Sequence, residues 1–129
     1  MKQERIKLGA RDGLHGIFHH LDALQKWRKG ETFPPLWVEV SPTNTCNQRC
    51  FYCYVDFVGH KKLSIPEDLL VKIVRDMGMF GVKCCEFQGT GEPLLNKGLP
   101  DAILAGKKTG MDMCLVTNGV LLSREILEK

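Results

Sequence analysis

The sequence of 129 residues contains no run of about 18 to 20 apolar residues, the length that a helix needs to cross a bilayer. Its first residues, MKQERIKLGARDG, are charged and lack the apolar stretch and the small-residue cleavage site of a signal peptide. These absences predict a cytoplasmic protein without a membrane partner. Neither G-x-x-x-x-G-K-S/T nor G-x-G-x-x-G occurs, which argues against binding of a nucleoside triphosphate or a dinucleotide.

A strong charge of one sign is also missing. The formal net charge is only +3, and the Lys and Arg residues are scattered along the chain. No nucleic-acid partner is inferred, because nucleic-acid-binding domains concentrate basic residues on one face. With 43% hydrophobic and 26% charged residues, the composition is that of a globular segment with one modest core.

Apolar periodicity predicts one helix followed by three strand–helix units. The expected elements are a helix over residues 14–29, strands over 36–40, 82–88 and 111–117, a helix between Ser64 and Gly81, a helix over 98–109, and a short helix from Ser123. Ser64 and Glu67 form a candidate capping box around Pro66, and Gly110 is expected to follow the helix over 98–109.

Strands that alternate with helices at this spacing pair in parallel, through right-handed crossovers. The predicted fold class is therefore α/β: a partial, incomplete TIM-type βα barrel of three parallel βα units, preceded by an N-terminal helix. Three strands form an open sheet with two unpaired edges. We therefore expect the chain to be the first part of a larger barrel, apparently truncated or completed by a partner.

The cysteines are unevenly distributed. Three of the six fall within the eight residues CNQRCFYC, as Cys46, Cys50 and Cys53. The others, Cys84, Cys85 and Cys114, lie in the predicted strands, where they are expected to pack as small hydrophobic residues. In a reducing compartment, clustering of this kind favours a metal centre over disulfides.

The cysteine cluster has no fourth cysteine. A structural zinc site needs four ligands, and although His60 could supply one, the spacing is not that of a zinc ribbon; zinc binding stays the weaker alternative. A ferredoxin-like carrier also needs a fourth cysteine. His15 and His19 lie four residues apart, but no Glu follows His15, so a polar helix face is preferred to a zinc site. An iron–sulfur cluster held by three thiolates would leave one iron open to a small molecule.

Two further short motifs follow the second and third predicted strands: GTGEP at residues 89–93 and TNG at residues 117–119. Ligands of parallel α/β folds collect at the carboxyl ends of the strands. All three distinctive segments are predicted at this edge. Taken alone, GEP is a common turn, and TNG is first interpreted as a turn with Gly119 at positive φ.

Together the three segments resemble the radical S-adenosylmethionine (radical SAM) superfamily. The matching features are C-x3-C-x2-C with Tyr52 before the last cysteine, GTGEP in place of Gly-Gly-Glu-Pro, and TNG after the third strand. Thr90 replaces the first glycine of the family motif. The resemblance covers about residues 34–129, the first half of the family's core domain, and leaves residues 1–33 as an N-terminal helical extension.

The resemblance implies a 4Fe-4S cluster on Cys46, Cys50 and Cys53, with S-adenosyl-L-methionine chelated to the open iron and cleaved reductively to a 5′-deoxyadenosyl radical. The residues it implies for cofactor binding are Tyr52 near the adenine, Thr90, Gly91, Glu92 and Pro93 around the methionyl ammonium, and Thr117 and Asn118 as a secondary contact. No catalytic residue and no substrate are assigned. An electron donor such as flavodoxin or ferredoxin is expected. The alternative is a non-catalytic fragment or binding module that needs a complementing chain or an oligomer.

Overall fold

The computed structural model describes residues 19–55 and 62–128, and the chain divides into two compact units, Met1–Pro34 and Pro35–Lys129. In the first unit, α1 spans Leu21–Arg28 and ends at Lys29, with Gly30 following at φ 72°. This is the described part of the helix expected over 14–29. The earlier residues of that expected helix lie outside the described residues.

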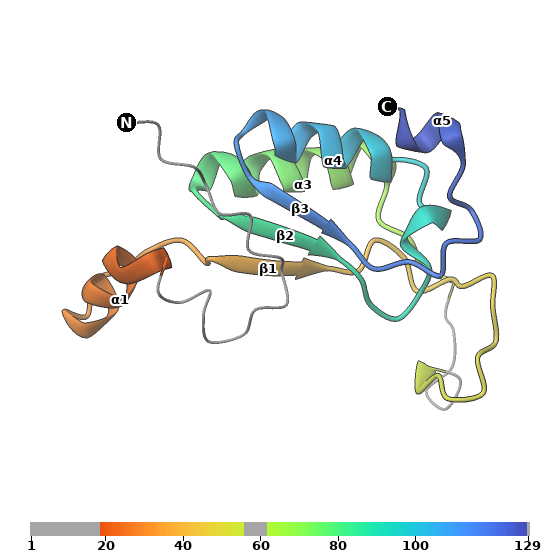
Figure 1. The fold of residues 1–129 in the computed structure, drawn as a ribbon, viewed down its shortest axis with the longest axis horizontal. Helices are drawn as coiled ribbons and strands as arrows, with labels where there is room; N and C mark the ends of the chain where they lie inside the picture. Colours follow the sequence, from red (N-terminus) through yellow and green to blue (C-terminus); the bar gives the residue numbers. More distant parts are fainter. Residues whose placement is uncertain (1–18, 56–61, 129) are drawn as a thin grey trace. The chain divides into compact units, whose positions relative to one another are not determined.

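The second unit contains a parallel sheet of three strands in the described part of the chain: β1 (Trp37–Val40), β2 (Cys84–Phe87) and β3 (Asp112–Leu115), in the order β1-β2-β3. Val40 pairs with Phe87, and Phe87 pairs with Leu115, so the three carboxyl ends lie side by side (Figure 1). The remaining elements are α3 (Glu67–Phe80), the 3-10 helix η2 (Pro93–Leu95), α4 (Leu99–Lys108) and α5 (Arg124–Leu127). The predicted fold of three parallel βα units is confirmed.

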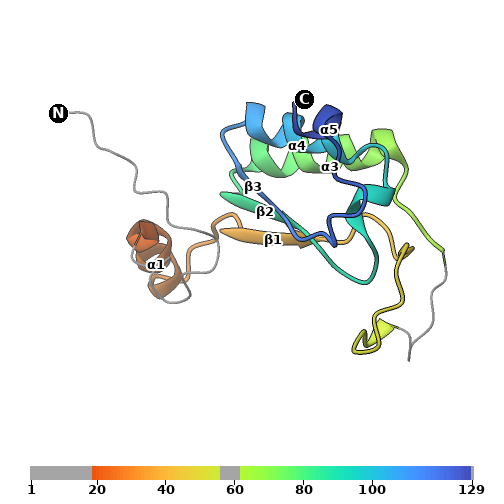
Figure 2. The ribbon, with the colours of Figure 1, turned by 45° about the vertical axis from the view of Figure 1, so that its right-hand side comes forward.

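The core lies between the sheet and two helices that cover one of its faces, α3 and α4 (Figures 1 and 2). Alternate strand residues point toward these helices, and Cys85 and Phe87 of the central strand are fully buried. Leu70 and Val74 of α3 meet Leu99 and Ala102 of α4 in the same cluster. Burial of this apolar stripe explains why the 3.6-residue periodicity is visible in the sequence.

The opposite face of the sheet carries the other alternate residues, which are Trp37, Glu39, Cys84, Glu86, Asp112 and Cys114. No helix among residues 35–55 and 62–128 covers this face (Figure 2). Three of its six side chains are acidic, and all six are partly or fully exposed. The apolar face of the sheet is therefore covered by helices, and the face that carries the acidic residues is open.

The predicted capping box is wrong. The N-cap of α3 is Pro66, without a side-chain hydrogen bond, and Ser64 lies outside the helix. The Ser64 hydroxyl donates to the Pro42 carbonyl at 3.4 Å and accepts from the side-chain amide of Asn96 at 3.1 Å. These two contacts with distant segments draw Ser64 away from the helix end, which a local motif could not reveal.

Other predicted helix ends are confirmed. Gly110 follows α4 at φ 85°, a conformation that glycine adopts without a steric penalty. Ser123 is the N-cap of α5, and its hydroxyl accepts from the Ile126 amide at 3.3 Å. None of the described helices is long and apolar enough to cross a membrane.

Candidate functional site at the carboxyl edge of the sheet

The loop after β2 lies directly against the start of the cysteine loop after β1. The Glu92 amide donates to the Thr45 carbonyl at 2.9 Å. A Cβ on Gly91 would lie 2.5 Å from the carbonyl oxygen of Thr45, and closer still to that of Thr43. Only glycine allows this approach, so the packing of the loop after β2 against the loop after β1 requires glycine at position 91.

The carboxylate of Glu92 joins the end of β2 to the end of β3. Its Oε1 accepts from the Thr117 hydroxyl at 2.6 Å and from the Leu94 amide at 3.1 Å. Its Oε2 accepts from the Asn118 amide at 2.9 Å. Glu92 is only 2% exposed, so this carboxylate is closed off from solvent. The structure thus brings GTGEP and TNG together through one side chain.

The TNG segment forms the turn that its sequence predicts. The Gly119 amide donates to the Thr117 hydroxyl at 3.1 Å, and the Val120 amide donates to the Asn118 side-chain oxygen at 3.0 Å. Gly119 has φ 75°, as the turn requires. The Asn118 side-chain amide also donates to the Asn47 side chain at 2.8 Å, and so connects this turn with the cysteine loop.

The cysteine loop itself extends away from the sheet (Figures 1 and 2). Cys46, Cys50 and Cys53 are free thiols and are each partly exposed. Local bonds organise the loop: the Gln48 amide donates to Cys46 Sγ at 3.4 Å, and the Cys53 amide donates to the Cys50 carbonyl at 2.9 Å. Within the described residues, no three His, Cys, Asp or Glu side chains are close enough to hold a metal ion. The three thiols share a loop but are not gathered around one point.

The aromatic residues of this loop are on the surface. Tyr52 is 76% exposed, and its ring meets that of Phe51 edge to face, with 5.0 Å between the centroids. Tyr52 is therefore accessible to a ligand. His60, the candidate fourth zinc ligand, and His15 both lie outside the described residues.

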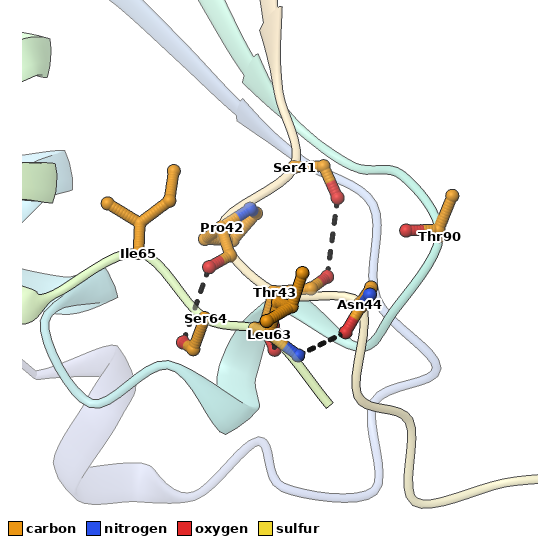
Figure 3. A pocket seen from close by; sticks show the side chains of 8 residues that line it. All are labelled: Ser41, Pro42, Thr43, Asn44, Leu63, Ser64, Ile65 and Thr90. Carbon is orange, nitrogen blue, oxygen red and sulfur yellow. Dashed lines mark hydrogen bonds between the residues drawn. The ribbon is translucent and has the colours of Figure 1, made fainter. Parts of the chain in front are cut away.

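An open pocket of about 320 Å³ lies beside the carboxyl end of β1 (Figure 3). Its lining residues are Ser41, Pro42, Thr43, Asn44, Leu63, Ser64, Ile65 and Thr90. Hydrogen bonds fix one wall: Asn44 Oδ1 accepts from the Leu63 amide at 2.6 Å, and the Thr43 hydroxyl donates to the Leu63 carbonyl at 2.9 Å. Thr90, from GTGEP, lies on the side of Ser41 and Asn44. The pocket is small, and Thr90 is the residue of GTGEP that lines it.

Sequence reasoning missed the residue that ties these loops to α4. Asn96 is 2% exposed, and its side-chain amide donates to the Ile65 carbonyl at 2.8 Å and to the Pro42 carbonyl at 3.2 Å. Its side-chain oxygen accepts from the Gly98 amide at 3.0 Å. No sequence pattern distinguishes this Asn from a surface loop residue, because its partners lie 31 and 54 residues away.

The other three cysteines lie in the sheet, as predicted. Cys85 is buried in the core, and burial raises the pKa of its thiol from 9.0 to about 11. Cys84 and Cys114 are partly buried on the open face, with 3.8 Å between their Sγ atoms. Burial, and next the neighbouring Cys114, raise the pKa of the Cys84 thiol from 9.0 to about 12. A thiol with such a pKa stays protonated near neutrality and is a poor metal ligand or nucleophile.

Comparison with known families matches the site-bearing part of the chain. Residues 40–129 match the profile of the Radical SAM superfamily. The match begins at the last residue of β1 and includes all three strand-end loops.

Individual proteins agree with this match. The chain is 38% identical to an S-adenosylmethionine-dependent nucleotide dehydratase of Lacinutrix mariniflava, over 65% of this chain and 18% of that protein. It is 34% identical to a GTP 3',8-cyclase of Clostridium perfringens, over 71% of this chain and 30% of that protein. It is 33% identical to an Fe-coproporphyrin III synthase of Methanosarcina barkeri, over 88% of this chain and 31% of that protein. The chain spans less than a third of the length of these relatives.

A solved structure gives the same fold. Streptococcus suis SuiB, crystallised with its precursor peptide SuiA, aligns with 99% of this chain and 29% of its own, with a TM-score of 0.65. Sequence identity is 18%, so this likeness concerns the fold alone. The fold of this chain thus corresponds to less than a third of a longer protein.

Proposed function

The chain belongs to the radical SAM superfamily, and from that premise we propose that it binds a 4Fe-4S cluster and S-adenosyl-L-methionine at the carboxyl edge of its sheet. One observation carries the proposal: Glu92 and its neighbours hold the loops after all three strands at this edge. The loop after β2 bonds to Thr45 and the loop after β3 bonds to Asn47. Both partners lie within two residues of Cys46.

The three cysteines fit such a cluster by their chemistry. Cys46, Cys50 and Cys53 are free thiols, partly exposed, on one loop outside any helix or strand. Thiolates are the usual ligands of iron–sulfur clusters, and three of them leave one iron for the cosubstrate. When bound, the cluster and S-adenosylmethionine supply a 5′-deoxyadenosyl radical by one-electron reductive cleavage. Because the thiols are not gathered in the described structure, we expect the loop to close when it binds iron.

The cosubstrate side of the site comprises the exposed parts of the other two loops. Thr90 and Gly91 are partly exposed at the edge of the sheet, whereas Pro93 is buried. Asn118 is exposed beside Thr117, and the accessible ring of Tyr52 is available to the adenine. We propose that these residues form the S-adenosylmethionine side of the site, and that Glu92 belongs to it as the side chain that joins the loops.

The remainder of the enzyme is proposed to come from further βα units, in the same polypeptide or in a complementing chain. The chain covers 18 to 31% of the relatives compared above. Substrate contacts and the docking site of an electron donor, such as a flavodoxin or ferredoxin, would then reside largely in those units. The same observation favours a second candidate, a non-catalytic module that binds the cluster but generates no radical without its complement.

Anaerobic reconstitution with iron and sulfide tests the proposal directly. We expect about four irons per chain and, after reduction, an EPR signal that changes when S-adenosylmethionine is added. Cys50→Ala should abolish the intact cluster, whereas Cys114→Ser, on the open face of the sheet, should not. A Cys50→Ala chain that assembles the same cluster would falsify the assignment. Formation of 5′-deoxyadenosine by the chain alone separates the enzyme from the module.

A further inference from the structure

We propose that Glu92 is a positioning residue, which fixes the three loops relative to one another through its carboxylate and does not itself contact S-adenosylmethionine. This inference rests on the proposed function for its cosubstrate, but the contacts that carry it are present in the described chain without any ligand. It differs from the role that the family motif implies for Glu92, namely reception of the methionyl ammonium.

The carboxylate of Glu92 is already occupied by hydrogen-bond donors of the chain itself. Its two oxygens accept three hydrogen bonds, from the Leu94 amide, the Thr117 hydroxyl and the Asn118 amide, at 2.6 to 3.1 Å. A carboxylate has about four acceptor positions, so only one is left. With 2% of the residue exposed, an ammonium group could reach that position only if the loops opened.

The Glu92 carboxylate is stabilised by neutral donors rather than by a cation. Within residues 19–55 and 62–128 no Lys, Arg or His forms an ion pair with Glu92, and its carboxylate accepts from two backbone amides and one hydroxyl. A buried carboxylate persists when several donors satisfy it, because unpaired buried charge is strongly disfavoured. The donors come from η2 and from the turn after β3. The contacts that stabilise the charge of Glu92 are therefore the same contacts that join these two loops.

The direction of these hydrogen bonds distinguishes glutamate from glutamine at position 92. The amides of Leu94 and Asn118 donate to different oxygens of the carboxylate. Glutamine has one oxygen and one NH₂ group, so Glu92→Gln must leave one of these two amides facing a donor. The Thr117 hydroxyl can rotate to accept from that NH₂ group, but a backbone amide cannot. Loss of the second acceptor therefore loosens either η2 or the TNG turn.

Urea unfolding of the full chain, without cluster or cosubstrate, tests the positioning role. Glu92→Gln and Thr117→Val should each lower the unfolding midpoint, and the double variant should lose less than the sum, because the Thr117 hydroxyl bonds a charged carboxylate in the parent chain and only a neutral amide in Glu92→Gln. Glu39→Gln, on the open face, is the matched control and should leave the midpoint unchanged. If Glu92→Gln does not fold, Thr117→Val alone must still accelerate amide exchange at Asn118. Unchanged stability in both variants, with no coupling, overturns the proposal.

A second measurement separates positioning from direct contact. The chain carrying its cluster is titrated with S-adenosylmethionine and, separately, with its des-amino analogue. The affinity for S-adenosylmethionine divided by the affinity for the analogue is then compared between the parent chain and Glu92→Gln. A positioning role predicts a ratio that changes by less than about twofold, even if both affinities fall. A direct charge-assisted bond predicts that the ratio falls about tenfold or more. Failure to bind cluster or S-adenosylmethionine at all would count against the proposed function, while the unfolding result would stand on its own.

Discussion

The side-chain amide of Asn118 donates to the side-chain oxygen of Asn47 at 2.8 Å, a bond between residues 71 positions apart. It connects the turn after β3 with the residue that follows Cys46. Both partners belong to loops, and the bond is exposed to solvent. It is therefore expected to order the beginning of the cysteine loop while adding little to the stability of the fold.

Removal of either partner of the Asn118–Asn47 hydrogen bond should have the same effect on the cysteine loop. Asn47→Ala and Asn118→Ala are each expected to change the free energy of unfolding by less than about 1 kcal/mol, as is typical of exposed contacts. Both should raise the rate of alkylation at Cys46 several-fold, measured by mass spectrometry of the cluster-free chain. If only one of the two variants exposes Cys46, the bond does not order the loop.

Gly91→Ala should separate the loop after β2 from the cysteine loop. The new methyl group would overlap the carbonyl oxygens of Thr43 and Thr45. Overpacking of this kind costs about 1–3 kcal/mol. Amide exchange at Glu92, whose N–H donates to Thr45, should accelerate. Gly119→Ala is the control, because it meets no atom within 4 Å and alters only the backbone preference at φ 75°. Unchanged exchange at Glu92 in Gly91→Ala would contradict the close approach.

Asn96 should tolerate substitution poorly. Asn96→Ala leaves the buried Gly98 amide and the Ile65 carbonyl without their side-chain partner and removes one of the donors to the Pro42 carbonyl, which is expected to lower the free energy of unfolding by about 2–4 kcal/mol. Asn96→Asp keeps the acceptor for Gly98 but places a second oxygen against the carbonyls of Pro42 and Ile65. At neutral pH it should therefore be less stable than Asn96→Ala in urea unfolding. The reverse order would contradict the contribution of the hydrogen bonds that the Asn96 side-chain amide donates to these two carbonyls.

Alkaline pH should destabilise the fold through Cys84. The folded chain raises the pKa of this thiol from 9.0 to about 12, so above pH 9 the unfolded chain releases the proton first. The contribution of the protonated Cys84 thiol to the free energy of unfolding is complete below pH 9 and is lost as the pH rises toward 12. The midpoint of urea unfolding should fall less steeply with pH in Cys84→Ala than in the parent chain, over pH 9 to 11. Parallel curves would show that the Cys84 environment is not desolvated.

The sequence predicted the elements and the edge at which the site lies, because both depend on short-range patterns. Helical stripes and β-rich runs are visible in consecutive residues, and parallel pairing then places the three motifs at the same edge. The contacts that organise the edge could not be predicted in this way. Glu92 meets Thr117 and Asn96 meets Ile65 only after the chain has folded.

The capping box at Ser64 illustrates the same limit. Locally, Ser64 and Glu67 satisfy the pattern of a helix start. The Asn96 side chain and the Pro42 carbonyl compete for the Ser64 hydroxyl, and these long-range partners win. A local motif thus predicts what a short peptide would do, and burial decides what the folded chain does.

The strand order β1-β2-β3 follows the order of the chain, and this has a consequence for biosynthesis. Each strand can add to the edge left by the one before, as it leaves the ribosome, without waiting for a later strand to insert. The cysteine loop would then be anchored as soon as Glu92 and Asn118 are made, before any further barrel units exist. Limited proteolysis of ribosome-stalled nascent chains that end beyond Asn96 or beyond Val120 would test this: protection of the cysteine loop should increase at the second length.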